Sequence, residues 1–165
     1  MAQLMAIDIE TYSDISLPDC GVHRYVSSEK FEILLFAYSI DEGEIQVIDL
    51  ASGERMPEEV MDLLTDDGVI KTAFNAAFER TCINRYFGLS LKPEAWRCTA
   101  VQSAILALPL SLEGVGEALS LDKKKMSEGK ELIRFFCMPC KATKANGGRN
   151  RNRPADAPEK WEQFK

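Results

Sequence analysis

Short apolar runs of strand length constrain the fold of this chain most. The first covers residues 3–9, and two more cover residues 31–40 and 44–50, joined by the acidic, glycine-containing linker DEGE. Apolar runs of this length between turn residues are typical of β-strands, and the linker predicts a hairpin of two antiparallel neighbours. The first fifty residues therefore predict three strands of one sheet.

Helical patterns alternate with strand patterns further along the chain. Pro57 and two acids open a helix whose apolar residues follow at helical spacing, and a fourth strand is expected at residues 69–74. A second helix is expected from Ala76 to Phe87, ended by Gly88, and further helices within residues 99–108 and 111–121. This order predicts an α/β fold, a mixed sheet flanked by helices. Residues 1–165 are expected to form a single domain.

The composition excludes several classes of protein. Hydrophobic residues make up 45% of the chain and charged residues 28%, which is typical of a folded domain and not of a disordered chain. The longest apolar run is too short to span a membrane, and the acidic N-terminus is unlike a signal peptide. The five scattered cysteines do not suggest a disulfide framework. We expect a cytoplasmic protein with no membrane partner.

Positive charge is concentrated in the last quarter of the chain. Residues 1–122 hold eight Lys or Arg against 21 Asp or Glu, whereas residues 123–165 hold 12 against five. A long loop is expected at residues 138–158, and its segment 141–153 has five basic residues and no acid. The loop either remains solvated or guides DNA past an otherwise acidic domain. Lysines within residues 123–126 are expected to add to the same surface.

The segment Ile7-Asp8-Ile9-Glu10-Thr11 places two carboxylates on one side of a strand. Residues two apart in a strand point to the same face, so Asp8 and Glu10 would lie together while the isoleucines face the other layer. Mg²⁺ or Mn²⁺ would offset the repulsion between the two carboxylates. The alternative is a solvated strand end with two surface acids.

A second acidic segment follows the fourth strand. FNAAFE, residues 74–79, places Asn75 at the strand end and Glu79 in the first turn of the next helix. Glu79 would then converge on the same site as Asp8 and Glu10. The alternative is an ordinary helix start, with Asn as the cap and Glu next to the positive end of the helix dipole.

With these two segments the chain resembles the DEDD, or DnaQ-like, 3′-to-5′ exonucleases, and most closely the exonuclease domain of phage-type family A DNA polymerases. IDIET at residues 7–11 matches the first exonuclease motif, and FNAAFE at residues 74–79 matches the second. The stretches FEILLFAYSID, WRCTAVQSAILALPLSLEGVGEAL and PEKWEQF also look like that polymerase group. The resemblance covers nearly the whole chain.

The resemblance implies a ribonuclease H-like fold and hydrolysis by two metal ions, Mg²⁺ or Mn²⁺. Such ions, roughly 4 Å apart, activate a water molecule and stabilise the leaving 3′ oxygen. In the family, acids of these motifs hold the metals, which here implies Asp8, Glu10 and Glu79. Thr11, Asn75 and Phe78 match positions that touch the terminal nucleotide or frame the site. The implied partners are the 3′ end of single-stranded DNA and the polymerase domain of the same full-length chain, encoded by a phage or prophage and acting in the cytoplasm of a bacterial host.

The sequence departs from the family pattern at two points. Glu79 stands where the second motif has Asp. The third motif, Tyr or His followed four residues later by Asp, is expected just after the helix that begins at Pro158, where the chain ends. Asp156 matches no motif position. We therefore expect a truncated exonuclease domain with an incomplete two-metal site, which binds metal weakly and hydrolyses DNA slowly, if at all.

Other functions remain as alternatives. The fold can serve as a non-catalytic module that binds single-stranded DNA or supports a polymerase domain, which Glu79 slightly favours, or as a free-standing RNA or DNA exonuclease, which the missing third motif disfavours. Cys137 and Cys140 form a CxxC pair without the further ligands that a zinc site needs. His23 is the only histidine, which excludes a multi-histidine metal site.

Overall fold

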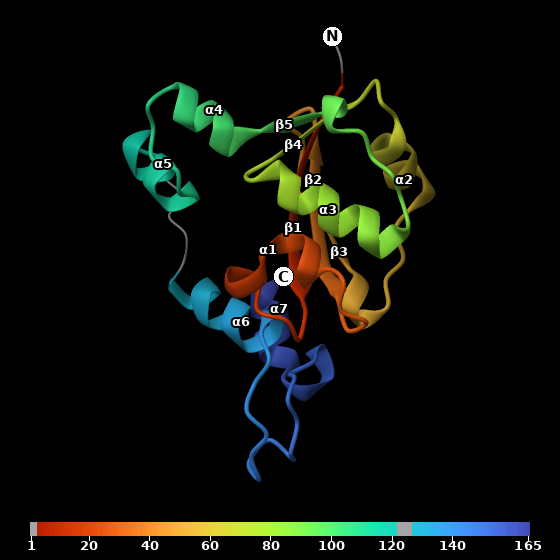
Figure 1. Cartoon of the computed structure of the whole chain (residues 1–165), viewed down its shortest axis with the longest axis vertical. Helices are drawn as coiled ribbons and strands as arrows, with labels where there is room; N and C mark the ends of the chain where they lie inside the picture. Colours follow the sequence, from red (N-terminus) through yellow and green to blue (C-terminus); the bar gives the residue numbers. More distant parts are fainter. Residues whose placement is uncertain (1–2, 122–126) are drawn as a thin grey trace.

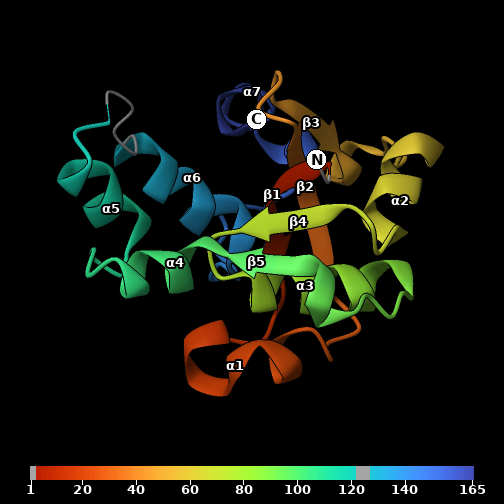
Figure 2. The same ribbon diagram turned by 90° about the horizontal axis from the view of Figure 1, so that it is seen from above.

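A five-stranded mixed sheet forms the centre of the computed structural model, which describes residues 3–121 and 127–165. The strand order is β3-β2-β1-β4-β5 (Figure 2). Strands β1, β2 and β3 pair in antiparallel fashion, whereas β4 and β5 run parallel to β1. The strands are β1 (Leu4–Tyr12), β2 (Glu32–Ile40), β3 (Gln46–Asp49), β4 (Ile70–Ala73) and β5 (Trp96–Cys98). The mixed sheet and the β2–β3 hairpin predicted from the sequence are confirmed.

Helices cover both faces of this sheet (Figure 1). They are α1 (Leu17–Tyr25), α2 (Glu58–Thr65), α3 (Ala76–Phe87), α4 (Thr99–Ile105), α5 (Leu112–Ala118), α6 (Ser127–Cys137) and α7 (Pro158–Phe164), with short 3₁₀ turns η1 (Leu50–Ser52), η2 (Pro93–Ala95) and η3 (Pro154–Asp156). None of the helices in the described ranges is long and apolar enough to cross a membrane.

Two apolar clusters hold the layers together. On one face of the sheet, Ile7 and Ile9 of β1 are buried with residues of α1, α2 and α3. On the other face, Tyr12 is buried with Phe136 of α6 and Trp161 of α7. The alternation along β1 therefore divides its side chains between two different helical layers.

Several elements differ from the sequence-based prediction. Residues 96–98, expected only as the lead into a helix, form strand β5, and helices α1 and α6 were not predicted. Helix α4 ends at Ile105 rather than near residue 108, since Ala107 takes a positive φ of 57° two residues before Pro109. The predicted loop at 138–158 is shorter, because η3 and α7 occupy its end. The lysines expected to extend the basic surface, within residues 123–126, lie outside the described residues.

Trp161 attaches α7 to the edge of the sheet. Its ring lies 4.9 Å from the ring of Phe136, between centroids, and its indole nitrogen donates a 2.7 Å hydrogen bond to Asp49 at the end of β3. Trp161 is only 2% exposed. Since a hydrogen bond to a charged acceptor is stronger than a neutral one, this contact stabilises the docking of α7.

We expect Trp161→Phe to lower the free energy of unfolding by about 1–3 kcal/mol, because Asp49 Oδ2 loses the indole donor and keeps only the longer, 3.7 Å contact with Lys165. Trp161→Ala should cost about 3–5 kcal/mol through the cavity that it leaves. Urea denaturation followed by circular dichroism measures both. Trp96→Phe is the matched control, since the indole nitrogen of Trp96 is buried with no hydrogen-bond partner in the described structure. Equal losses for the two Trp→Phe variants would contradict this account.

Candidate active site

Strand β1 presents Asp8 and Glu10 on the face opposite Ile7 and Ile9. The two isoleucines are buried, whereas Asp8 is exposed and Glu10 is half-buried. This is the alternation that the sequence predicted. The register of β1 against β2 shifts between Glu10 and Thr11, where β2 has one extra residue. Such bulges strengthen the local twist and commonly lie beside functional sites.

Glu79 reaches the same region from the first turn of α3. The helix starts after Asn75, whose backbone takes the left-handed conformation with φ 79° and ψ 47°. Asn tolerates this conformation better than most residues, which explains why it stands at this tight turn between β4 and α3. The Asn75 side chain is exposed and makes no capping hydrogen bond. Asn75 therefore lies between β4 and α3, where the sequence predicted it, but its side chain does not cap the helix.

The Glu79 carboxyl group is buried without full hydrogen bonding. The residue is 4% exposed, and its Oε2 atom has no hydrogen-bond partner in the described structure. Burial, followed by the negative charge of Asp8, raises the pKa of Glu79 from 4.5 to about 8. The ionised carboxylate is thus disfavoured unless a positive charge compensates it. Asp8 is thus within electrostatic reach of the Glu79 carboxyl group.

The acids of the described residues are not arranged as a closed metal site. Within residues 3–121 and 127–165, no group of three or more His, Cys, Asp or Glu side chains is arranged to hold one ion. The buried Oε2 of Glu79 and the nearby charge of Asp8 nevertheless fit a divalent cation, since hard cations prefer carboxylate oxygens. The structure therefore fits a cation at Asp8 and Glu79, with Glu10 two residues away on the same strand face.

Cys137, the first cysteine of the CxxC pair, contacts Glu10. The Cys137 thiol, at the end of α6, donates a hydrogen bond to Glu10 Oε2 at 3.6 Å. Burial and the charge of Glu10 raise the pKa of this thiol, so it remains protonated and can donate. Cys140 instead contacts the carbonyl oxygen of Arg149. The two cysteines of the CxxC pair thus have separate structural partners.

Cys98 is a second neighbour that the sequence did not identify. It lies at the end of β5. A negative charge on Cys98 would raise the pKa of Glu79, so the two side chains are near each other. Burial acts to raise the pKa of the Cys98 thiol, but hydrogen bonds from backbone amides that include those of Asn75 and Ala76 outweigh it and lower the pKa. The short strand β5 thus brings a polarisable side chain behind Glu79.

The remaining predicted residues lie beside the acids in different environments. Thr11 is buried, and its hydroxyl oxygen lies 2.9 Å from the hydroxyl of Tyr25. Phe78 is half-buried and packs against Tyr25, with ring centroids 6.3 Å apart. Asp156 does not join the site, because its carboxylate pairs with Arg149 and accepts the backbone N–H of Arg153.

Almost the whole chain is similar in sequence to part of a phage DNA polymerase. The DNA polymerase of Bacillus phage SP02 is 54% identical over 161 residues, which cover 98% of this chain. The chain spans 25% of the length of that polymerase. No protein-family model matches the chain.

Solved nuclease structures share the fold. Brucella melitensis NrnC with bound Mg²⁺ superposes with a TM-score of 0.56 at 22% identity, over 75% of this chain and 56% of that chain. Escherichia coli RNase D, an exoribonuclease involved in structured RNA processing, gives a TM-score of 0.54 at 17% identity, over 77% of this chain and 30% of that one. The chain has the ribonuclease H-like fold of these nucleases. It is homologous to part of a phage DNA polymerase, as the two sequence motifs indicated.

In the absence of metal, Glu79→Gln is expected to stabilise the fold at alkaline pH. Because the pKa of Glu79 rises from 4.5 to about 8 on folding, the folded chain retains a proton that the unfolded chain releases. The contribution of Glu79 to the free energy of unfolding is fully present below pH 4.5, its pKa in the unfolded chain. It is lost as the pH rises to about 8, its pKa in the folded chain. Glu79→Gln avoids this loss of unfolding free energy, which is on the order of 3–5 kcal/mol at the alkaline end of the range.

Urea denaturation in EDTA at about pH 5 and about pH 8 measures this difference. Glu44→Gln serves as the control, because it makes the same substitution at a solvent-exposed position. The account is wrong if wild type and Glu79→Gln differ by the same free energy at both pH values.

Proposed function

We propose that the chain is the proofreading-type exonuclease module of a phage or prophage DNA polymerase, acting in the cytoplasm of a bacterial host. Its reaction is metal-dependent removal of 3′-terminal nucleotides from DNA. The observation that supports this most is the buried Oε2 of Glu79, which has no hydrogen-bond partner in the described structure and lies within electrostatic reach of Asp8, in a chain similar to part of a phage polymerase. The 3′ end of single-stranded DNA and the polymerase region of a longer chain are the partners.

Asp8, Glu10 and Glu79 are the residues that would hold Mg²⁺ or Mn²⁺. When bound, the ions supply an activated water and stabilise charge at the scissile phosphate. The structural neighbour NrnC contains Mg²⁺ in this fold. Glu79 has a longer side chain than the Asp of the family motif, and its raised pKa means that metal binding must displace a proton near neutral pH.

The chain's own groups position the reacting end. The hydrogen bond from Cys137 restrains Glu10 Oε2, and the buried hydroxyl pair of Thr11 and Tyr25 stabilises the end of β1. Because the Thr11 hydroxyl is engaged, its contact with a terminal nucleotide would use the main chain. Asn75 is exposed at the strand end and would offer an amide to the nucleotide, while Phe78 packs against Tyr25.

A non-catalytic nucleic-acid-binding module is the second candidate. The observation that favours it is that the acids, in the described part of the chain, do not form a group of three arranged around one ion. In that case the exonuclease fold would hold DNA or support a polymerase domain without hydrolysing the strand.

A graft distinguishes these functions, because the 54% identity to the phage SP02 polymerase allows this chain to replace the matching quarter of that enzyme. The graft is expected to release nucleotides from 3′-labelled single-stranded DNA in Mn²⁺. Asp8→Ala should reduce the rate at least about a hundredfold, because a metal ligand is lost. Glu79→Asp, which restores the family residue, should retain the activity.

Asp62→Ala, at an exposed position of α2, is the control and should hydrolyse at the unmodified rate. Hydrolysis that persists in Asp8→Ala contradicts the catalytic assignment. DNA binding without hydrolysis in every graft supports the non-catalytic module.

A further inference from the structure

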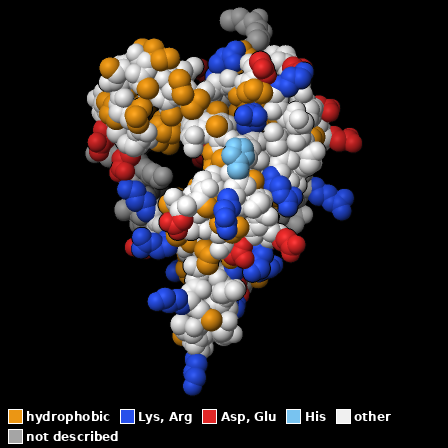
Figure 3. All heavy atoms as spheres, viewed as in Figure 1, with side chains coloured by type: hydrophobic (Ala, Val, Ile, Leu, Met, Phe, Trp, Pro, Cys, Tyr) orange, Lys and Arg blue, Asp and Glu red, His pale blue; other side chains and the backbone are white. Residues whose placement is uncertain are grey.

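A basic arm, defined as residues 138–153, projects from the body of the molecule between α6 and η3 (Figure 1). It carries five Lys or Arg residues and no acid, within a chain whose formal net charge is −6. Lys and Arg side chains mark the far end of this projection in the space-filling view (Figure 3). Positive charge is thus gathered on one element and kept away from the acidic body.

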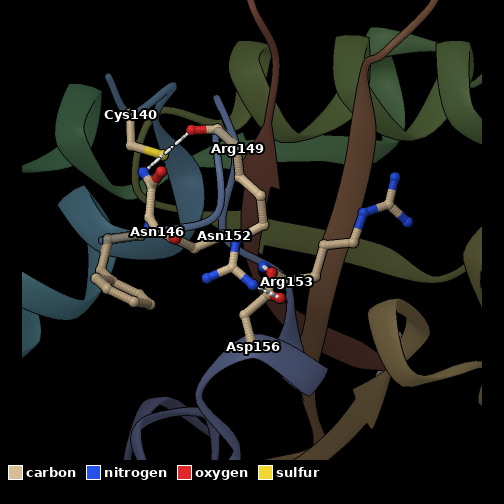
Figure 4. A network of polar contacts seen from close by, with 7 residues as sticks. Cys140, Asn146, Arg149, Asn152, Arg153 and Asp156 are labelled. Atoms are coloured by element: carbon tan, nitrogen blue, oxygen red, sulfur yellow. Dashed lines mark hydrogen bonds and ion pairs between the residues drawn. The ribbon is translucent and has the colours of Figure 1, made fainter. Parts of the chain in front are cut away.

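Hydrogen bonds within the arm give its tip a defined shape (Figure 4). The amide group of Asn146 donates to the carbonyl oxygens of Lys141 at 2.8 Å and Arg149 at 3.1 Å, and its oxygen accepts from the backbone of Thr143 at 2.9 Å. The backbone of Cys140 pairs with that of Asn150 at 2.9 Å. Side chains at this tip are therefore presented by an ordered turn, which lowers the entropic cost of binding.

The foot of the arm is attached to the strand that carries the site acids. The Arg151 guanidinium lies 3.9 Å from the ring centroid of Tyr12, two residues beyond Glu10 on the same face of β1, and pairs with Glu32 at 2.5 Å. The Cys137 thiol, one residue before the arm, contacts Glu10. Both ends of the arm thus meet the end of β1 next to the candidate active site.

A cleft of about 480 Å³ lies at this foot. Its lining includes Tyr12, four cationic side chains and three acids: Lys30, Arg149, Arg151 and Arg153, with Glu29, Glu32 and Asp156. Two of these cations are paired with two of the acids, Arg149 with Asp156 and Arg151 with Glu32. The aromatic ring offers a surface on which a base could stack, whereas the paired cations of the cleft leave phosphate contact mainly to the rest of the arm.

Four of the five cations of the arm divide into two groups, and the fifth, Arg153, lines the cleft. Arg149 pairs with Asp156 and Arg151 with Glu32, so these two contribute mainly to the structure of the foot. Lys141 and Lys144 at the tip are exposed, and neither has an ion pair among the described residues. An ordered tip with two unpaired lysines is suited to phosphate contact.

We propose that the basic arm binds the phosphate backbone of the DNA strand whose 3′ end enters the β1 site, several nucleotides before that end. The inference rests on the proposed function for the position of the 3′ end. The arm holds the strand electrostatically and without base specificity, because the tip lysines contact phosphates. A purely solvated arm would leave binding unchanged when the tip charge is removed.

The test measures DNA binding by fluorescence anisotropy in Ca²⁺, separately from hydrolysis in Mn²⁺. The probes are thymidine dinucleotide, which is too short to reach the tip, and an oligothymidylate of roughly 16 nucleotides. Lys141→Gln/Lys144→Gln should weaken binding of the long probe about tenfold and reduce the salt dependence of log K by roughly 1.4. Binding of the dinucleotide should be unchanged.

Two controls separate charge from structure. Arg55→Gln/Lys92→Gln removes two exposed positive charges outside the arm and should bind both probes like wild type. Lys141→Arg/Lys144→Arg keeps the charge and should retain binding of the long probe. All variants should keep the wild-type thermal midpoint, because the altered side chains are exposed.

The proposal is overturned if Lys141→Gln/Lys144→Gln binds the long probe as tightly as wild type does. This holds even where hydrolysis in Mn²⁺ supports the exonuclease function. Equal weakening by the Arg55/Lys92 control also overturns it, because the effect would then come from net charge. Loss confined to the tip variant supports the arm, and an accompanying absence of hydrolysis counts against the exonuclease function alone.

Discussion

The central position of β1 is the constraint on which the rest of this structure depends. It is paired with β2 over residues 5–12 and with β4 over residues 4–6, which fixes it in the sheet, so its side chains alternate between two faces. Ile7 and Ile9 bury one face under α2 and α3. Asp8 and Glu10 must then occupy the other, because a slip of one residue would bury two carboxylates in the apolar layer.

Periodicity in the sequence predicts this arrangement where the elements are long enough to show it. The apolar runs locate β1 to β4, and helix α3 has the predicted bounds Ala76–Phe87. Strand β5 is only three residues long, so it shows no alternation. Helix α1 contains Pro18, and Gly21 inside it takes a positive φ of 73°, which explains why a helical pattern was not recognised there.

The sequence predicts which residues form the candidate site better than it predicts their burial, contacts and pKa values. The spacing of Asp8 and Glu10 predicts their common face, and the position of Glu79 in a first turn predicts that it comes near them. The burial of Glu79 depends on tertiary packing, and the contact from Cys137 to Glu10 joins residues 127 positions apart. Such contacts leave no local pattern, so the raised pKa of Glu79 could only be recognised in the folded structure.

The uneven charge of the chain becomes intelligible once the fold is considered. An acidic surface repels a nucleic acid, yet charges separated by more than about 10 Å are largely screened at ordinary ionic strength. What a DNA strand encounters is therefore the local charge, which is positive along residues 138–153 and negative at the β1 acids. Arg151 on Tyr12 and Cys137 on Glu10 connect these two regions directly. Under the proposed function, a backbone held by the arm would therefore lie beside the β1 carboxylates, which would need a cation to accept a phosphate. Separate placement of the charges would then let the domain attract a polyanion without neutralising those acids.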